Sequence, residues 1–354
     1  MKRAVTALLI ILCIQGCNLD SETGMSSLKP RAKGSIGEIV LVMDTALWKR
    51  PIGLKMKELL TAPVPGLPRG EPLYKVHFID PDRLNNVLRG ASNMIFVTTL
   101  DGTARMKNYF TPESLQKIRD NPDLFMNKAQ NEFAKDQEIL QLFSKNEESL
   151  LEKINANESI IRNYFNEVEK KRLLRKYETD RSEKGIEKIL NSKYGFEMHV
   201  PKGFQTAISE EDFIWIRDIQ YDIDQSIFIT WKTYTSEEQF EKDRIIQWRN
   251  QITKNYIFAD PEDTSSYVKT EVEHALVNSK TISFNEQYGV EVRALWKNSS
   301  FMGGPFISYT FLDQTTNRLY YIEALLYSPN VDQRNLMKQL EAVLWTFKPV
   351  SEQS

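Results

Sequence analysis

The clearest predicted chemistry belongs to Cys17, which ends the stretch Ile14-Gln15-Gly16-Cys17. A cysteine in this setting can be alkylated by diacylglycerol, after which cleavage before it frees an amine that is acylated in turn. Ile14 and Gly16 fit the pattern of a lipoprotein processing site, whereas Gln15 is less typical of it. The sequence therefore predicts that Cys17 carries lipid, palmitate-like acyl chains included. Several acyl chains together anchor a protein stably to a membrane.

The residues before Cys17 resemble a signal peptide. Lys2 and Arg3 give a positive start, and an apolar run follows at 4–14. Since a membrane-spanning helix needs about 20 apolar residues, this run is too short to span and suits a cleaved signal. We expect 1–16 to be the lipoprotein signal peptide. An ordinary secretory signal with a coincidental cysteine is the alternative.

Residues 17–36 are rich in Ser, Gly, Lys and Pro, which predicts a flexible tether. Asn18 follows the cysteine, where an aspartate would favour retention in the inner membrane. Asp20 and Glu22 leave the destination open between the periplasmic face of the outer membrane and the cell surface. The predicted location is therefore a lipid-anchored position in the cell envelope, at the outer membrane.

The cysteine count limits the remaining chemistry. Cys13 leaves with the signal peptide and Cys17 carries lipid, so no other thiol is left for a disulfide, a nucleophile or a metal. The three histidines show no metal-binding spacing, and no Gly-x-Ser-x-Gly, phosphate-binding or dinucleotide-binding motif occurs. We therefore expect no cofactor, no metal and no recognisable catalytic residue. The histidines are His77, His199 and His274.

Other residues leave two interpretations open. Asp222 with Asp224, and Glu262 with Asp263, could form a weak calcium site or an acid–base pair, but solvated loops explain them more simply. Gly303 and Gly304 could form a loop whose backbone amides contact a ligand, or a tight turn between strands. Five tryptophans in the second half could bind sugars or a partner if exposed, but a core position is favoured. They are Trp215, Trp231, Trp248, Trp296 and Trp345.

Length and composition predict two folded domains. The chain has 354 residues, 41% hydrophobic and 11% aromatic, and a net charge of −2. This composition supports real cores and gives no electrostatic reason to expect nucleic-acid binding. The basic residues at 170–176 are offset by neighbouring acids, so they indicate a solvated helix face.

The hydrophobic pattern predicts an α+β fold: two α/β sandwich-type domains with mainly antiparallel sheets, joined by a long helix. We expect a first domain at 37–190 and a second at 191–350. Ser144 and Glu147 form a capping-box pattern, which predicts a helix from there to about residue 180. The second half combines strands with helices at about 235–254 and from about 330 onward.

Two resemblances accompany this interpretation. Residues 195–348, with Val200-Pro201-Lys202-Gly203-Phe204 near their start, resemble the Mog1/PsbP-type sandwich, which implies a fold without a function. Nearly the whole chain after the signal resembles an uncharacterised, domain-of-unknown-function family of Bacteroidetes cell-envelope lipoproteins. The segments that carry it are Gly37–Met43, Gly66–Pro68 with Glu71-Pro72, Asp136-Gln137, Phe213–Trp215 and Met302–Phe306.

That family implies a location and no activity. The sequence therefore favours a binding or envelope-assembly module, with an unknown protein or small molecule as its partner. The alternatives are an envelope hydrolase using carboxylates near Gly303 and Gly304, or a carrier of an apolar ligand in an enclosed cavity.

Overall fold

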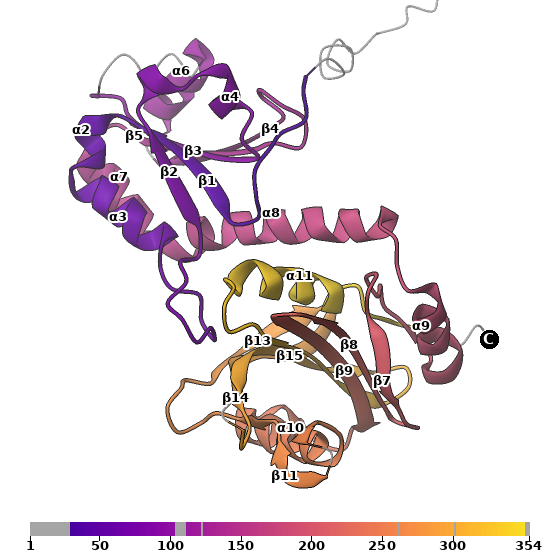
Figure 1. Cartoon of the computed structure of the whole chain (residues 1–354). Coiled ribbons are helices and arrows are strands. Elements are labelled where there is room, and N and C mark those ends of the chain that lie inside the picture. Colours follow the sequence, from indigo (N-terminus) through magenta and orange to yellow (C-terminus); the bar gives the residue numbers. More distant parts are fainter. Residues whose placement is uncertain (1–28, 103–110, 122, 261, 301, 351–354) are drawn as a thin grey trace, which may run out of the picture.

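The computed structural model describes residues 29–102, 111–121, 123–260, 262–300 and 302–350. Within them, the chain forms two α+β domains, as the sequence predicts, with α8 (Glu158–Thr179) running between them (Figure 1). The domain limits at 190 and 191 stay a prediction. Cys17 and the residues before it lie outside the described ranges.

The first domain is built on a five-stranded sheet in the order β2-β1-β3-β5-β4. The strands β1, β2, β3 and β5 are parallel, and only β4 runs antiparallel to its neighbour. Central β1 and β3 contain continuous apolar runs, Ile39–Met43 and Met94–Val97, which suit parallel strands that helices cover on both faces. This sheet departs from the antiparallel pairing that prevails in the rest of the chain. The strands are β1 (Glu38–Met43), β2 (Lys75–Ile79), β3 (Asn93–Thr99), β4 (Met126–Gln130) and β5 (Glu138–Ser144).

Helices cover this sheet on both sides. One apolar cluster packs α3, α7 and α8 against one face, and a second packs the region around α4 against the other. The helices are α2 (Thr45–Trp48), α3 (Pro51–Leu60), α4 (Asn86–Arg89), α6 (Pro112–Asp120) and α7 (Glu147–Ala156), with a 3-10 turn at Pro81–Arg83.

The predicted single long helix is two helices. Asn146, rather than Ser144, caps α7 by accepting a hydrogen bond from the Ser149 N–H at 3.0 Å. Ser144 instead ends β5. Asn157 then leaves the helical conformation, with φ −126° and ψ 25°, and α8 begins after it. An asparagine side chain competes for local backbone hydrogen bonds, and here its Nδ2 donates to the Lys153 carbonyl at 2.9 Å.

The second domain has an eight-stranded antiparallel sheet between helices. Its order is β12-β14-β15-β16-β9-β8-β7, and β13 pairs with β14 beside β12. Helix α11 packs on one face with the larger apolar cluster, and α10 packs on the other (Figure 1). The strands are β7 (Gln205–Ser209), β8 (Phe213–Gln220), β9 (Ile223–Thr233), β12 (Lys269–Thr270), β13 (Asn278–Phe284), β14 (Gln287–Lys297), β15 (Gly303–Asp313) and β16 (Arg318–Tyr327).

Smaller elements complete this domain. Helix α9 (Lys184–Ile189) continues into a π turn at Leu190–Tyr194, and β6 (Phe196–Glu197) pairs with β17 (Lys348–Pro349). Strands β10 (Phe258–Asp260) and β11 (Asp263–Tyr267) form a separate hairpin. The side chains of Ser236 and Gln239 form a capping box at a 3-10 turn, Glu237–Phe240, which precedes α10 (Lys242–Tyr256). Helix α11 (Arg334–Leu344) starts after Gln333.

Helix α10 carries a residue that apolar periodicity did not predict. Its buried positions include Arg249, which is 0% exposed. The guanidinium makes two hydrogen bonds to Glu323 on β16, at 2.8 and 2.7 Å, and lies 4.0 Å from the Phe306 ring centroid. Tyr321 also donates a hydrogen bond to Glu323. This fully buried ion pair joins α10 to the centre of the sheet.

Candidate functional site

Polar groups from both domains line a cleft between them. It has a volume of about 530 Å³. The first domain contributes a loop at 62–67 and one side of α8, and the second contributes α11 and the near ends of β13, β14 and β15. Six basic and four acidic side chains line it: Arg162, Lys170, Lys280, Arg293, Arg334, Lys338, Glu167, Glu169, Glu291 and Glu341. The cleft therefore carries a positive excess in a chain whose net charge is −2.

Arg293 holds the floor of the cleft together. Its Nε donates to Glu291 Oε1 at 2.8 Å, and its Nη2 donates to Glu341 Oε1 at 2.7 Å. Tyr309 donates to the same Glu341 oxygen at 3.0 Å and accepts a hydrogen bond from Trp345 Nε1 at 3.0 Å. Glu291 and Arg293 alternate along β14, so both point to the α11 side of the sheet. The network links β14, β15 and α11.

Burial and charge set the protonation states on this floor. Burial raises the pKa of Glu291, but Arg293 and Lys280 lower it further, so the pKa lies below the ordinary 4.5. Burial lowers the pKa of Arg293, yet Glu341 and Glu291 raise it well above its ordinary value. Burial, reinforced by the same two carboxylates, raises the pKa of the Tyr309 hydroxyl. Near neutral pH Glu291 and Arg293 are therefore charged, and the Tyr309 hydroxyl is neutral.

Helix α8 forms the opposite wall. Glu169 is only 4% exposed, and its carboxylate accepts hydrogen bonds from the Gly37 N–H at 2.6 Å and from Lys338 Nζ at 2.7 Å. The bond between Lys338 and Glu169 joins α11 to α8 across the domain boundary. Two buried polar atoms on the same wall have no hydrogen-bond partner among the described residues. They are Arg162 Nε and Asn166 Oδ1, which lie one helical turn apart.

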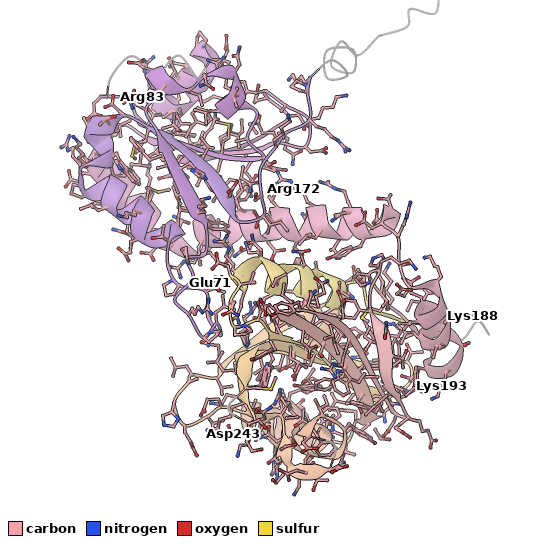
Figure 2. The ribbon with its side chains drawn as sticks, viewed as in Figure 1. Glu71, Arg83, Arg172, Lys188, Lys193 and Asp243 are labelled. Carbon is pink, nitrogen blue, oxygen red and sulfur yellow. The ribbon has the colours of Figure 1, made fainter. Side chains whose placement is uncertain are left out.

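A loop of the first domain fixes the mouth of the cleft. The Glu71 carboxylate accepts hydrogen bonds from the backbone N–H groups of Gln333 and Arg334, both at 2.8 Å. Figure 2 shows Glu71 where this loop meets the start of α11. Gly66 of the same loop, with φ +79°, packs against β14, because a Cβ at this position would lie 3.0 Å from Arg293 Cβ. The loop is thus held by α11 and by β14.

Further contacts hold α8 to the first domain. The Arg172 guanidinium donates to Asn93 Oδ1 at 2.6 Å and to the carbonyls of Ser92 and Asp136 at 2.9 Å (Figure 2). On the opposite side of the helix, the Tyr177 hydroxyl donates to the Gln339 carbonyl on α11 at 3.1 Å. Helix α8 is therefore hydrogen-bonded to both domains beside the cleft.

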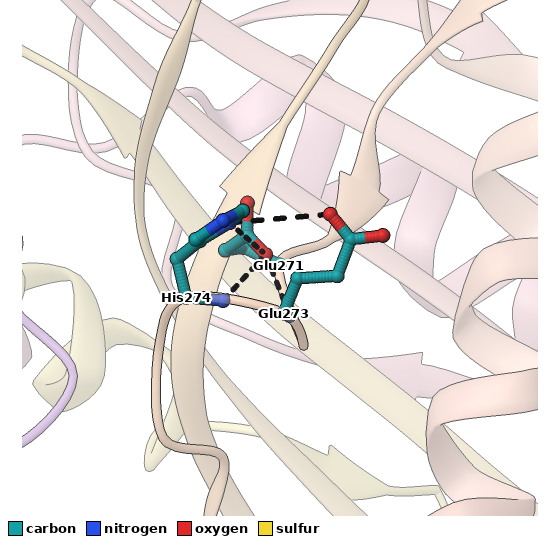
Figure 3. Close-up of side chains that lie close together, drawn as sticks. All are labelled: Glu271, Glu273 and His274. Carbon is teal, nitrogen blue, oxygen red and sulfur yellow. Dashed lines mark hydrogen bonds and ion pairs between the residues drawn. The ribbon is translucent and has the colours of Figure 1, made fainter.

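A second group of ionisable side chains lies in an exposed turn after β12. Glu271, Glu273 and His274 come close enough together to hold a cation (Figure 3). Lys297 already neutralises them, with Nζ 2.7 Å from Glu271 Oε2 and 3.2 Å from Glu273 Oε2. The lysine, helped by backbone N–H donors, lowers the pKa of Glu271 to about 2. The geometry is that of an ion-paired turn.

The residues singled out from sequence do not meet at the cleft. Gly303 and Gly304 lie in β15 rather than in a loop, paired with Lys297 and Trp296. Gly304 is buried, and a Cβ there would lie 2.0 Å from the Leu326 carbonyl oxygen, so close packing requires glycine. A ligand role for the two glycines stays a prediction. Asp224 instead forms an ion pair with Arg217 on β8.

None of the three histidines lines the cleft, and the tryptophans of the second half pack in its core. His199 stacks on Tyr177 with ring centroids 4.9 Å apart, and burial lowers the pKa of its imidazole. His77 lies on the edge strand β2, and His274 lies in the ion-paired turn. Trp215 and Trp296 are buried, and Trp231, Trp248 and Trp345 are partly buried against the two clusters of the second domain. The favoured core interpretation therefore describes their positions.

No sequence motif marks the residues that line the cleft. Some segments quoted for the family resemblance nevertheless lie beside the cleft. Gly37, Gly66 and Glu71 all make contacts across the domain boundary. Gln137 does not, because its amide donates to the carbonyls of Arg89 and Ala91 within the first domain. In the part of the chain that is described, no helix is long and apolar enough to span a membrane.

Comparison with known protein families also divides the chain into two parts. Residues 32–178 match a family described as a domain of unknown function (DUF8532), and residues 183–346 match another domain of unknown function (DUF4837). No curated protein sequence matches this chain. The two matches correspond to the two domains seen in the structure, so the cleft lies between two units that neither family description assigns a function.

Several solved structures are similar to a little under half of this chain. The Ran-binding protein Mog1p of Saccharomyces cerevisiae is 9% identical, covering 44% of this chain and 91% of its own, at a TM-score of 0.31. The cyanobacterial PsbP of Synechocystis sp. PCC 6803 is 14% identical, covering 45% and 88%, at 0.30. A Bacteroides thetaiotaomicron protein is 11% identical, covering 45% and 47%, at 0.25. Scores at this level say nothing about function.

Proposed function

We propose that this chain is a lipid-anchored binding module whose ligand site is the cleft between its two domains. The observation that carries the proposal is the pair of buried polar atoms without partners, Arg162 Nε and Asn166 Oδ1, on the α8 wall of the cleft. A buried polar group without a hydrogen bond costs about 1–3 kcal/mol, so a ligand that bonds both atoms gains affinity from them. Both domains supply the lining, which is a common place for a ligand site.

The charged lining separates this proposal from the two alternatives. A carrier of an apolar ligand needs an enclosed apolar cavity, whereas ten ionisable side chains line this one. A hydrolase needs an activated nucleophile or an acid–base pair. Here Arg293 lies between Glu291 and Glu341 and keeps both carboxylates in ion pairs, and none of the three histidines is among the lining residues. Binding is therefore the function that this lining supports best.

A photo-crosslinking experiment on the full-length chain tests the site. Benzoylphenylalanine would replace Asn163, an exposed lining residue of α8, or Tyr221, an exposed residue outside the lining. We expect a light-dependent adduct of defined mass at position 163 and none at 221. The substitution Asn278→Trp, which fills the mouth from β13, should abolish that adduct. Equal labelling at both positions, or an adduct indifferent to Asn278→Trp, would contradict the proposal.

The anchor has an independent test. Cys17→Ser should abolish incorporation of labelled palmitate and release the chain from the membrane fraction, because the thiol is the predicted point of attachment. Cys13→Ser is the matched control and should leave both readouts unchanged. Retained labelling in Cys17→Ser would exclude lipidation at this residue.

A further inference from the structure

Strand β13 borders the cleft with one unpaired edge. Asn278–Phe284 pairs with β14 along its whole length, and no strand among the described residues pairs with its other side. The neighbouring β12 pairs with β14 only at Trp296 and Lys297, beyond the end of β13. Residues 278–281 are exposed. Unpaired backbone N–H and C=O groups on such an edge can pair with an added strand.

The charge beside this edge favours an acidic partner. Lys280 points to the cleft side of β13 opposite Glu291, and its side chain is still 61% exposed. Arg334, at the start of α11, makes its side-chain hydrogen bonds to Asn335 and to the Pro72 carbonyl, so no carboxylate of the described residues pairs with it. Carboxylates on a partner would complement both cations.

The wall opposite contains two buried polar atoms of the kinds that a peptide group can bond. Arg162 Nε is a donor and Asn166 Oδ1 an acceptor, and both are buried in the lining without a partner. A backbone amide offers one acceptor, its carbonyl oxygen, and one donor, its N–H. A simple carboxylate or phosphate would satisfy the arginine and leave the asparagine oxygen unbonded.

We propose that the cleft binds an acidic polypeptide segment in extended conformation, which adds as a strand to the edge of β13. This inference rests on the proposed function, since it names the class of ligand for the same cleft. Main-chain hydrogen bonds to β13 would supply affinity, and Lys280 and Arg334 would select acidic side chains.

Selection from a random decapeptide display library on the immobilised full-length chain tests the proposal. Peptides enriched in Asp and Glu are expected, and Lys280→Gln should weaken a selected peptide by about tenfold, with a larger loss for Lys280→Glu. The control Lys188→Glu changes an exposed lysine of α9, away from the cleft (Figure 2), and should have no effect. A cooperative thermal unfolding transition would confirm that each variant is folded.

Backbone methylation separates strand addition from charge attraction alone. In a selected peptide, N-methylation of every second residue should abolish binding in one register and leave it within about twofold in the other, because alternate N–H groups point to β13. Selected peptides without acidic enrichment, or equal effects of the two registers, would overturn the inference. A non-peptide adduct at position 163 that Asn278→Trp abolishes would overturn it while leaving the proposed function intact.

Discussion

Glu71 Oε2 accepts the backbone N–H of Arg334 at 2.8 Å, although 263 residues separate them along the chain. The second carboxylate oxygen accepts the Gln333 N–H, so one side chain satisfies two N–H groups at the start of α11. Gln333 itself provides no side-chain cap. The first domain therefore supplies the N-terminal cap of a helix that belongs to the second domain, and its negative charge suits the helix dipole.

Removing this cap should loosen the contact between the domains. Glu71→Ala is expected to lower the free energy of unfolding by about 1–2 kcal/mol, because two buried N–H groups lose their acceptor. Urea unfolding would measure the loss. Glu178→Ala, which removes an exposed carboxylate on α8, should change stability by less than about 0.5 kcal/mol. Equal effects of the two substitutions would mean that the cap contributes nothing specific.

The close packing of Gly304 in β15 can be tested by substitution. Gly304→Ala should destabilise the chain by about 3 kcal/mol, since its Cβ would lie 2.0 Å from the Leu326 carbonyl oxygen and the sheet would have to shift. Gly185→Ala in α9 meets no atom within 4 Å and should gain up to about 1 kcal/mol from helix propensity. Thermal or urea unfolding would compare them. A stable Gly304→Ala protein would contradict the close-packing explanation.

The local pattern predicted most elements and missed the site for a physical reason. Glu291 and Arg293 alternate with apolar residues along β14, a pattern typical of a strand with one solvated face. That face is covered because α11 and α8 pack over it, which depends on contacts such as Lys338 with Glu169. Lys338 and Glu169 are far apart in the sequence, so no local pattern contains both of them. The apolar run Ile39–Met43 of β1 needs no such information, because one short window of sequence contains the whole pattern.

Arg249 shows the same limit inside a helix. Ile245 and Ile252 are buried at helical spacing on the inner face of α10, and Arg249 lies between them on the same buried side. An arginine is rarely buried unless it is paired, and its partner Glu323 lies 74 residues away. The sequence could therefore indicate the helix without revealing the ion pair beneath it.

This buried pair should be strongly non-additive. Arg249→Met is expected to cost about 3–5 kcal/mol because it leaves Glu323 charged and buried, whereas Arg249→Met with Glu323→Leu should cost much less. A double-mutant cycle from urea unfolding measures the coupling. Arg244→Met, at an exposed position of the same helix, controls for the effect of the methionine itself. Additive losses would show that the two side chains act independently.

Glu291 should make the cleft sensitive to acid. Its pKa is lowered in the folded chain, so its contribution is fully present above the unfolded value of about 4.5 and is lost as the pH falls through the folded pKa. Glu291→Gln should therefore cost about 2 kcal/mol at pH 6 and progressively less toward pH 3, as wild-type Glu291 also becomes neutral. Urea midpoints across this range measure the difference. Glu211→Gln, at an exposed turn, should show no such convergence. A cost for Glu291→Gln that stays constant between pH 6 and pH 3 would mean that hydrogen bonds, rather than the charge, account for its role beside Arg293.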